Sequence, residues 1–163
     1  MQKQRDIRVE VKGLVPTQTG CGVFLGNDGK IIAIFVDHSV AAAITMFLRN
    51  TPKERPLTHD LISSIFTGLG VRVERVVIND LKNSTYYARL ILHAENELGK
   101  KILEVDARPS DSIALAVQQK SPIFVSAKVF SAVEDMSEVL KRMNQEGEED
   151  PSGPAQGEAE PEE

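Results

Sequence analysis

The sequence predicts one domain of the α/β or α+β class, with a mixed, largely antiparallel sheet and three to four helices. Stretches in which apolar and polar residues alternate, typical of strands, flank segments whose apolar residues recur at helical spacing. The run "SIALAV", residues 112–117, is so apolar that a helix there must be covered on most sides. With 163 residues and a hydrophobic fraction of 41%, the chain is long enough for one packed core.

The N-terminal part predicts three strands. Ile7, Val9 and Val11 alternate with charged residues, which is typical of a half-buried strand. In "CGVFLGNDGKIIAIFV", residues 21–36, Asn-Asp-Gly separates two apolar runs. Because Asp and Gly both tolerate positive φ, this stretch predicts a hairpin.

Two helices are expected next. From Asp37 to Arg49, apolar residues fall at i, i+3, i+4, i+7 and i+8, and Asp37 is the expected N-cap. After a polar connection with two prolines, Thr58 is expected to cap a second helix, which two glycines end. The predicted buried face of this second helix consists of Leu61, Ile62, Ile65, Phe66 and Leu69.

The second half of the chain predicts a further hairpin and more strands. "VRVERVVIND" and "TYYARLILHA" are long strand-type runs joined by the polar turn "LKNS". "KILEVD" predicts another strand, a short apolar helix is expected from Asp111 to about Gln119, and "PIFVS" predicts a last short strand. The sheet would then have six or seven strands.

The composition divides the chain into three parts. Residues 1–132 form the expected domain, and 133–144 form a short, weaker C-terminal helix. Residues 145–163 carry eight acids, no base and no aliphatic stripe, which predicts a disordered acidic tail. The preceding 144 residues carry 19 bases and 16 acids, a charge of +3. The tail is either a solubilising segment or a competitor of nucleic acid for the basic body.

The same composition indicates a cytoplasmic protein. The start "MQKQRDIRVEVKG" has no apolar region of the signal-peptide type, and no apolar run approaches the length of a membrane span. Cys21 is the only cysteine, so an intrachain disulfide is excluded, and its place in a strand favours a buried inert thiol over a nucleophile. We therefore expect no membrane association.

Polar residues gather where elements end, and these are the candidate catalytic residues. His59 and Asp60 open the second helix, whereas Asp106, Arg108 and Asp111 fill the junction before the apolar helix. In α/β sheets, sites form where strands end and helices begin. His59 is placed as an acid or base, and Arg108 is placed to neutralise a phosphate oxygen.

Three of these carboxylates are also candidate metal ligands. If the loops share one edge, Asp60, Asp106 and Asp111 would converge on a divalent cation. Hard oxygen ligands are what Mg²⁺ or Mn²⁺ accepts. Such an ion would activate water and stabilise a phosphoryl transition state. We expect no other cofactor.

Other interpretations of these residues stay open. Asp and Ser in the first turn of a helix cap free N–H groups, worth roughly 0.5–2 kcal/mol, so the same residues would then only stabilise the fold. Asp60 followed by Asp80-Leu81-Lys82 resembles the D…(D/E)-x-K core of metal nucleases, but the second part falls at a turn. The lone His38 and His93 are expected to be structural or exposed.

Three segments together resemble the bifunctional nuclease family. They match R-P-x-T-H-D-L-L at Arg55–Leu61, V-x-I-x-D-L-x-x-x-T-[FY]-Y-A at Val77–Ala88, and [ED]-[IV]-D-x-R-P-S-D-A-I-x-L-A with a P-I-[FY]-V strand at Glu104–Val125. The resemblance covers roughly residues 5–130 and implies an α/β nuclease that acts on RNA and DNA. Where the family usually carries Glu-Ala or Glu-Gly after the third strand, this chain has "FVDHSVAAAI".

Two functions follow as hypotheses. The first is a metal-assisted nuclease that hydrolyses phosphodiester bonds, with RNA or DNA as partner. The alternative is a non-catalytic, oligomeric binding or regulatory module with the same fold. An oligomer, most simply a dimer, is expected because the hairpin of residues 71–94 has apolar residues on both faces, and exposed apolar patches mark interfaces.

Overall fold

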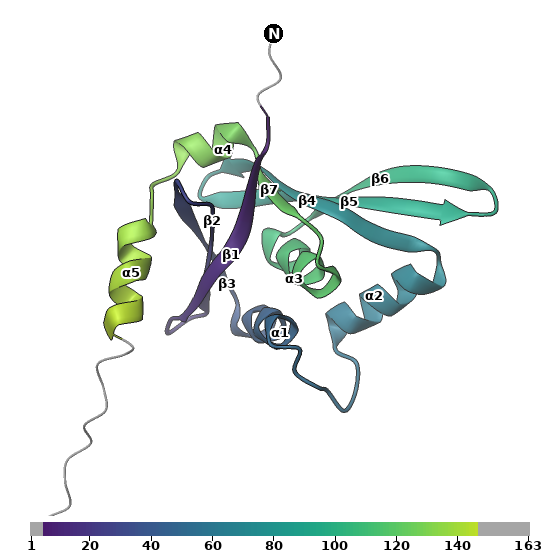
Figure 1. Ribbon diagram of the computed structural model, residues 1–163, viewed down its shortest axis with the longest axis horizontal. Coiled ribbons are helices and arrows are strands. Elements are labelled where there is room, and N and C mark those ends of the chain that lie inside the picture. The colour runs from purple at the N-terminus through teal and green to yellow at the C-terminus, as the bar shows by residue number, and fades with distance from the viewer. Residues whose placement is uncertain (1–4, 147–163) are drawn as a thin grey trace, which may run out of the picture.

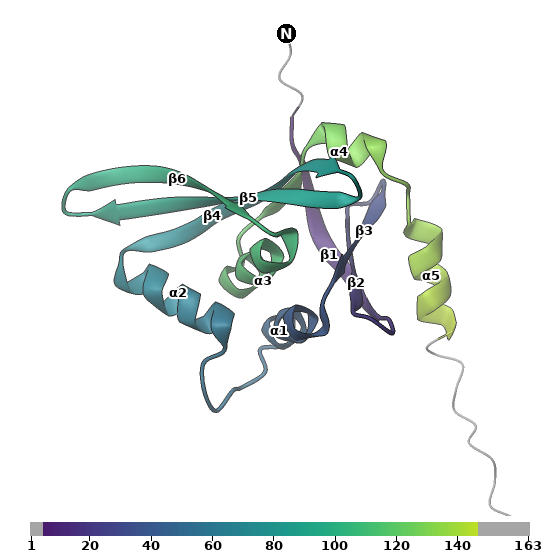
Figure 2. The same cartoon turned by 180° about the vertical axis from the view of Figure 1, so that it is seen from behind.

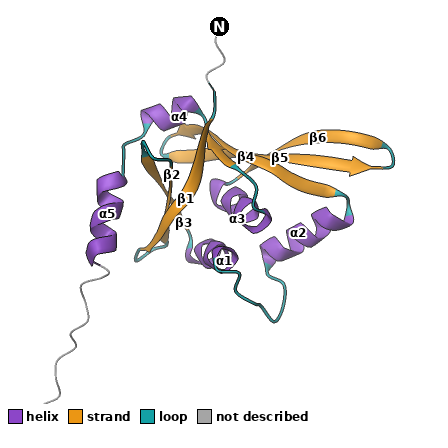
Figure 3. Cartoon of the chain, in the orientation of Figure 1, coloured by secondary structure: helices purple, strands orange, loops and turns teal. Residues whose placement is uncertain are grey.

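The computed structural model describes residues 5–146 as an α/β domain (Figures 1 and 3). Its strands are β1 (Ile7–Pro16), β2 (Cys21–Gly26), β3 (Ile31–Val36), β4 (Val71–Lys82), β5 (Thr85–Asn96), β6 (Gly99–Ala107) and β7 (Ile123–Val125). Its helices are α1 (His38–Leu48), α2 (Thr58–Gly68), α3 (Pro109–Gln119), α4 (Ala127–Ala132) and α5 (Ser137–Glu146).

All seven strands form one sheet in the order β3-β2-β1-β7-β4-β5-β6. Only β4 and β7 pair in parallel, so the predicted mixed, largely antiparallel sheet is confirmed. The two predicted hairpins are β2–β3 and β4–β5. The sheet is strongly twisted, with α1, α2 and α3 on one side and α4 and α5 on the other (Figures 1 and 2).

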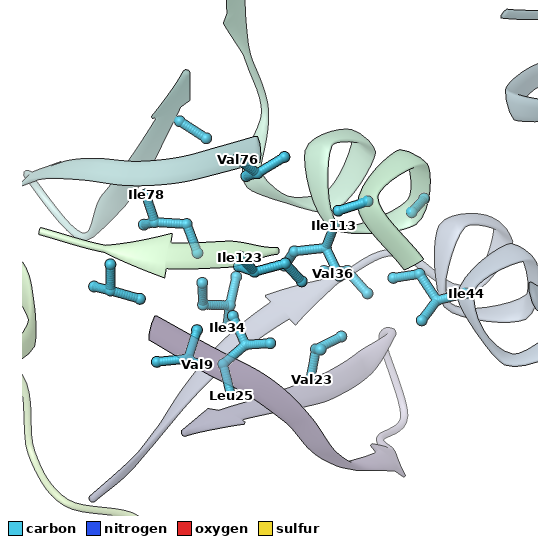
Figure 4. Close-up of a cluster of buried hydrophobic side chains, with 14 of the residues drawn as sticks. Val9, Val23, Leu25, Ile34, Val36, Ile44, Val76, Ile78, Ile113 and Ile123 are labelled. Carbon is cyan, nitrogen blue, oxygen red and sulfur yellow. The ribbon is translucent and has the colours of Figure 1, made fainter. Parts of the chain in front are cut away.

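The core lies between the sheet and the helices α1 and α3. Ile113 of α3 and Ile44 of α1 are fully buried, and Ile113 lies between side chains of the two halves of the sheet (Figure 4). Almost the whole first half of α3 is buried, as the sequence predicts for "SIALAV". Aliphatic residues make up most of this core, which fits a chain without tryptophan.

Helix starts are fixed by side chains and by proline. Asp37 is the N-cap of α1, as predicted, and its carboxylate accepts a hydrogen bond from the amide of Val40 at 3.0 Å. The second helix differs by one residue, because Leu57 rather than Thr58 is its N-cap. The third begins at Pro109, two residues before the predicted start, since proline at the first position needs no N–H partner.

The C-terminal helices differ from the prediction. Residues 5–146 form five helices, because Ser126 caps the additional helix α4 by accepting from the amide of Val129. The expected helix over 133–144 begins only at Ser137, where the carboxylate of Asp135 accepts from the backbone amide. The remainder of the predicted tail, residues 147–163, lies outside the described residues.

The predicted buried face of α2 is only partly buried. Ile62 and Phe66 pack against the core, but Leu61, Ile65 and Leu69 are 56%, 50% and 64% exposed. The apolar face of α2 is wider than the stripe along which the helix packs against its neighbours. The periodicity predicts the helix correctly, but how much of its apolar face is buried depends on the neighbouring elements.

Two glycines at the end of α2 are expected to respond oppositely to alanine. Gly70 has φ of +66°, and an added Cβ would lie 2.5 Å from the carbonyl oxygen of Glu95. Gly68 is helical, and an added Cβ would meet nothing within 4 Å. Gly70→Ala should therefore lower the free energy of unfolding by about 1–3 kcal/mol. Gly68→Ala should raise it by about 0.5 kcal/mol. Urea denaturation measures both, and equal effects of the two substitutions would contradict this.

Candidate functional site

The starts of three helices open on one cavity of about 520 Å³. Ser39 and Val40 line it from α1, His59 from α2, and Arg108 and Asp111 from the start of α3. The positive ends of helix dipoles and unpaired N–H groups favour an anion at such a place. The cavity therefore combines an anion-attracting backbone with three side chains that the sequence predicts to be functional, those of His59, Arg108 and Asp111.

Asp111 joins His59 and Arg108 through separate oxygens. Its Oδ1 accepts from Nε2 of His59 at 3.0 Å, and its Oδ2 accepts from Nε of Arg108 at 2.8 Å. A carboxylate only accepts hydrogen bonds, so Nε2 carries a proton and a neutral ring keeps its lone pair on Nδ1. The His59 side chain is 8% exposed, while that of Arg108 is 65% exposed. The aspartate thus fixes both the tautomer of the histidine and the position of the arginine.

The charges around Asp111 also set its protonation. Burial acts to raise the pKa of Asp111, but the hydrogen bonds from Arg108 and His59 outweigh it and hold the pKa below its usual value. The same pairing raises the pKa of Arg108. Asp111 is therefore charged, and Arg108 is cationic, over the whole physiological pH range.

Asp37 is a further member of this site. Its Oδ2 lies 3.9 Å from a terminal nitrogen of Arg108, and hydrogen bonds from Ser39 and Val40 help to lower the pKa of its carboxyl group. The sequence indicates Asp37 only as a helix cap. The sequence signal that could indicate a functional role for Asp37 is the family resemblance, because the family places an acidic residue near this position.

Asp60 sits close to the cluster but has its own partners. Nζ of Lys53 lies 2.7–2.8 Å from its two oxygens, and Nε2 of Gln118 donates to it at 3.0 Å. The Leu57 amide also donates to it at 2.8 Å, which closes the first turn of α2. Asp60 therefore anchors the start of α2, and through it the position of His59.

Asp106 points to the other face of the sheet. Its neighbours Val105 and Ala107 pair with core residues of β5, and successive side chains of a strand alternate between faces. The Asp106 side chain is 69% exposed and bonds Arg89 at 3.0 Å. The structure therefore brings His59, Arg108 and Asp111 together and leaves Asp106 apart.

The three predicted metal ligands do not form a common group. Asp60, Asp106 and Asp111 are each paired with a different cation. Within residues 5–146, no cluster of three or more His, Cys, Asp or Glu side chains is arranged to hold a metal ion. In this arrangement the three aspartates do not fit a shared Mg²⁺ or Mn²⁺ ion. The reason is the strand alternation at Asp106, which the spacing of residues alone does not reveal.

The remaining candidates have structural surroundings. Asp80 bonds Lys82 and Lys128 at the end of β4, and its pKa is lowered to about 2, chiefly by the hydrogen bond from Lys82. Cys21 is buried, which raises the pKa of its thiol, as expected for an inert cysteine. Among the described helices, none is long and apolar enough to cross a bilayer.

The charge on Asp111 gives a stability prediction with a definite sign. Since its pKa is lower in the folded chain, the ionised carboxylate stabilises the fold above the unfolded pKa of about 3.9. That contribution disappears as the pH falls through the folded pKa. The difference in free energy of unfolding between the natural chain and Asp111→Asn should be constant near neutral pH and shrink from about pH 4 downward. Urea titrations across pH 2–7 measure it.

Asp28→Asn is the matched control, because Asp28 is exposed in the β2–β3 turn. A difference between the natural chain and Asp111→Asn that does not change between pH 6 and pH 2 would contradict the prediction. It would show that the charge of Asp111 adds nothing to stability.

Fold and cavity together define an α/β domain with an Asp-linked His and Arg at the converging starts of three helices. A family model described as "Bifunctional nuclease domain" matches residues 23–138. The chain belongs to the bifunctional nuclease domain family, as the three sequence segments predict.

Two kinds of relatives each match 105 residues of the chain. "Uncharacterized protein Rv1829" of Mycobacterium tuberculosis is 37% identical over 105 residues, which are 64% of this chain and 60% of the relative. "Bifunctional nuclease 1" of Oryza sativa subsp. japonica is 28% identical over 105 residues, which are 63% of this chain and 31% of the relative. The aligned part thus spans less than two thirds of each relative's length.

Proposed function

We propose that the chain hydrolyses phosphodiester bonds of RNA and DNA in the cavity where α1, α2 and α3 begin. The observation that carries the proposal is the bridge by Asp111, which holds His59 and Arg108 at 3.0 and 2.8 Å. Family membership and the names of the rice relatives support the same reaction class. A His–carboxylate pair beside an arginine provides a base and a phosphate anchor in one place.

His59 acts on the attacking water. With Nε2 bound to Asp111, the lone pair on Nδ1 accepts the proton that water loses as it attacks phosphorus. The half-buried carboxylate of Asp111 stabilises the imidazolium that results. The leaving oxygen takes its proton from solvent or from the protonated histidine.

Arg108 acts on the phosphate. Its Nε is committed to Asp111, and one terminal nitrogen lies 3.9 Å from Asp37, beyond hydrogen-bond distance. The terminal amino groups can therefore donate to the non-bridging oxygens, where negative charge develops during attack. The helix starts around the cavity add partial positive charge. The carboxylates of the aspartates in the first turns offset the positive charge of Arg108 and of the helix starts. Tight binding of free phosphate is therefore not expected.

The direct experiment is a cleavage assay with the full-length chain. Single-stranded and duplex RNA and DNA are incubated with Mg²⁺, with Mn²⁺ and with chelator, beside Asp111→Asn and Asp106→Asn. We expect cleavage that falls at least tenfold in Asp111→Asn, because the histidine loses its orienting charge. Absence of cleavage under every condition would overturn the proposal.

The same assay decides between the two arrangements of residues. If cleavage is lost in the Asp106→Asn variant and also in the natural chain with chelator, the three-carboxylate metal site is favoured over the His59–Asp111–Arg108 cluster. Metal dependence remains a prediction until that measurement, since the proposed roles of His59 and Arg108 are compatible with an ion recruited together with the substrate.

We also propose that the chain forms a dimer through β6. This nine-residue strand is one of the two edges of the sheet, pairs with β5 without a register shift, and exposes Ile102 to 53%. An edge strand presents unpaired N–H and C=O groups that can pair with another chain. A dimer of this kind favours the alternative function, that of an oligomeric binding module. It is equally consistent with an enzyme that is itself a dimer.

The sequence of β6 is complementary to itself. If two copies pair antiparallel about a two-fold axis through Ile102, Lys100 of each copy faces Glu104 of the other. Both residues lie on the same face of the strand as Ile102, so the two isoleucines meet at the axis. Within one described chain, Lys100 bonds Glu95, whereas Glu104 has no ion pair.

Sedimentation of the full-length chain tests the dimer. We expect a dimer for the natural chain, a monomer for Glu104→Lys, and a restored dimer when Lys100→Glu is added to it. A monomer at micromolar concentration, or no effect of the charge reversal, would refute this interface.

A further inference from the structure

Phe35 is an exposed aromatic residue on an otherwise buried stretch of strand. Its neighbours Ile34 and Val36 are 3% and 8% exposed, whereas Phe35 is 71% exposed. Alternation along β3 places it on the outward face, at an edge of the sheet. Its register partner is Gly22, so no side chain directly opposite on β2 covers the ring. Phe35 therefore offers an uncovered aromatic side chain at the edge of the sheet.

Phe35 lines a second cavity, of about 340 Å³, beside the candidate site. Tyr86 lines the same cavity, as do Ser84 and Thr85 from the turn between β4 and β5. Ser84 has a φ of 61°, and the preceding residue is left-handed as well, which tightens this turn. The cavity is therefore lined by two aromatic residues and by two hydroxyl-bearing residues of a tight hairpin turn.

Arg108 belongs to both cavities. It lines the cavity that contains His59 and Asp111, and it also lines the one that contains Phe35 and Tyr86. A phosphate held by Arg108 would therefore have the acid–base pair on one side and the aromatic cavity on the other. A ligand that spans both would carry an anionic group next to a flat apolar group.

We infer that the Phe35 cavity binds a nucleobase next to the phosphate that Arg108 holds. Aromatic side chains beside a cationic anchor bind single-stranded nucleic acid, because every base has a face that stacks. A base stacked on Phe35 has left its duplex neighbours, so this subsite selects single-stranded over duplex substrate. The inference rests on the proposed function for the substrate class, since it places a nucleotide across the two cavities.

Binding without cleavage tests the subsite. Fluorescence anisotropy with a labelled single-stranded oligodeoxythymidine, measured in chelator on the full-length chain, gives the affinity. Phe35→Ala should weaken binding roughly 5- to 100-fold, the range for losing one stacked base, while Phe35→Trp should keep it. Tyr87→Ala is the matched control, because Tyr87 is 41% exposed and does not line the cavity. Equal affinities of Phe35→Ala and the natural chain would overturn the inference.

A second pair of measurements separates this inference from the proposed reaction. Cleavage of an oligonucleotide abasic at every position, which has no flat ring to stack, should proceed at the same rate in Phe35→Ala and in the natural chain. The same abasic oligonucleotide should bind the natural chain and Phe35→Ala equally. If the natural chain cleaves neither abasic nor normal strands, the proposed function fails while the binding result still stands. If Phe35→Ala weakens abasic and normal strands alike, base stacking is refuted.

Discussion

Replacing His59 with glutamine is expected to lower the rate of phosphodiester cleavage by about 100-fold or more, the usual contribution of a positioned acid or base. Glutamine keeps a polar side chain that can donate to Asp111, so the contact at 3.0 Å has a substitute. It has no group that accepts a proton from water near neutral pH. The loss should therefore appear in the rate and leave binding of the oligonucleotide nearly unchanged.

His93→Gln is the matched control for this substitution. His93 lies on β5 opposite Arg72, on the face of the sheet away from α3, and it lines neither cavity. Single-turnover cleavage of a labelled strand measures the rate, and circular dichroism checks that both variants are folded. Equal rates for His59→Gln and the natural chain would remove His59 from the reaction and leave Arg108 as an anchor only.

Replacing Ile113 with alanine is expected to lower the free energy of unfolding by about 3 kcal/mol, within the 2–5 kcal/mol found for such core truncations. Ile113 is fully buried where α3 meets α1 and the sheet (Figure 4). Three methylene or methyl groups would be lost from a site closed on every side. The surrounding side chains come from different elements, so they cannot collapse together to fill the space.

Ile65→Ala provides the control for that measurement, because the same chemical change occurs at a helical side chain that is 50% exposed. Its effect should be below about 1 kcal/mol, since little apolar surface is removed from contact. Chemical denaturation of both variants compares them. A loss below 1 kcal/mol in Ile113→Ala would mean that α3 is not packed as described. At denaturant concentrations near the unfolding midpoint of Ile113→Ala, a loss of cleavage would follow from unfolding alone.

Local patterns determined most of the secondary structure. The alternation around Val9, the Asp-Gly turn and the capping aspartate at residue 37 each act over a few residues, so their consequences appear in the sequence itself. The apolar run in α3 also revealed a buried helix, because no other environment accommodates it. The three motif segments indicated the family, which the match over residues 23–138 shows.

The width of contacts between elements could not be predicted in this way. The apolar arc of α2 looks uniformly buried in a helical projection, yet three of its five residues are exposed, since the main contacts of that helix are with β4 and α3. The short helix α4 has too few residues for a periodic signal, and it forms because Ser126 caps it. Both features depend on what lies nearby in space.

The candidate site shows the same division between sequence and tertiary structure. The sequence by itself determined that His59, Arg108 and Asp111 are the polar residues at helix starts, because proline, caps and apolar runs fix those starts locally. Only the tertiary structure decided that Asp111 bonds His59 across 52 residues as well as the nearby Arg108, that Asp37 joins them, and that Asp106 faces away. The physical reason is that strand register assigns each side chain to one face, and helix packing selects which helix starts meet.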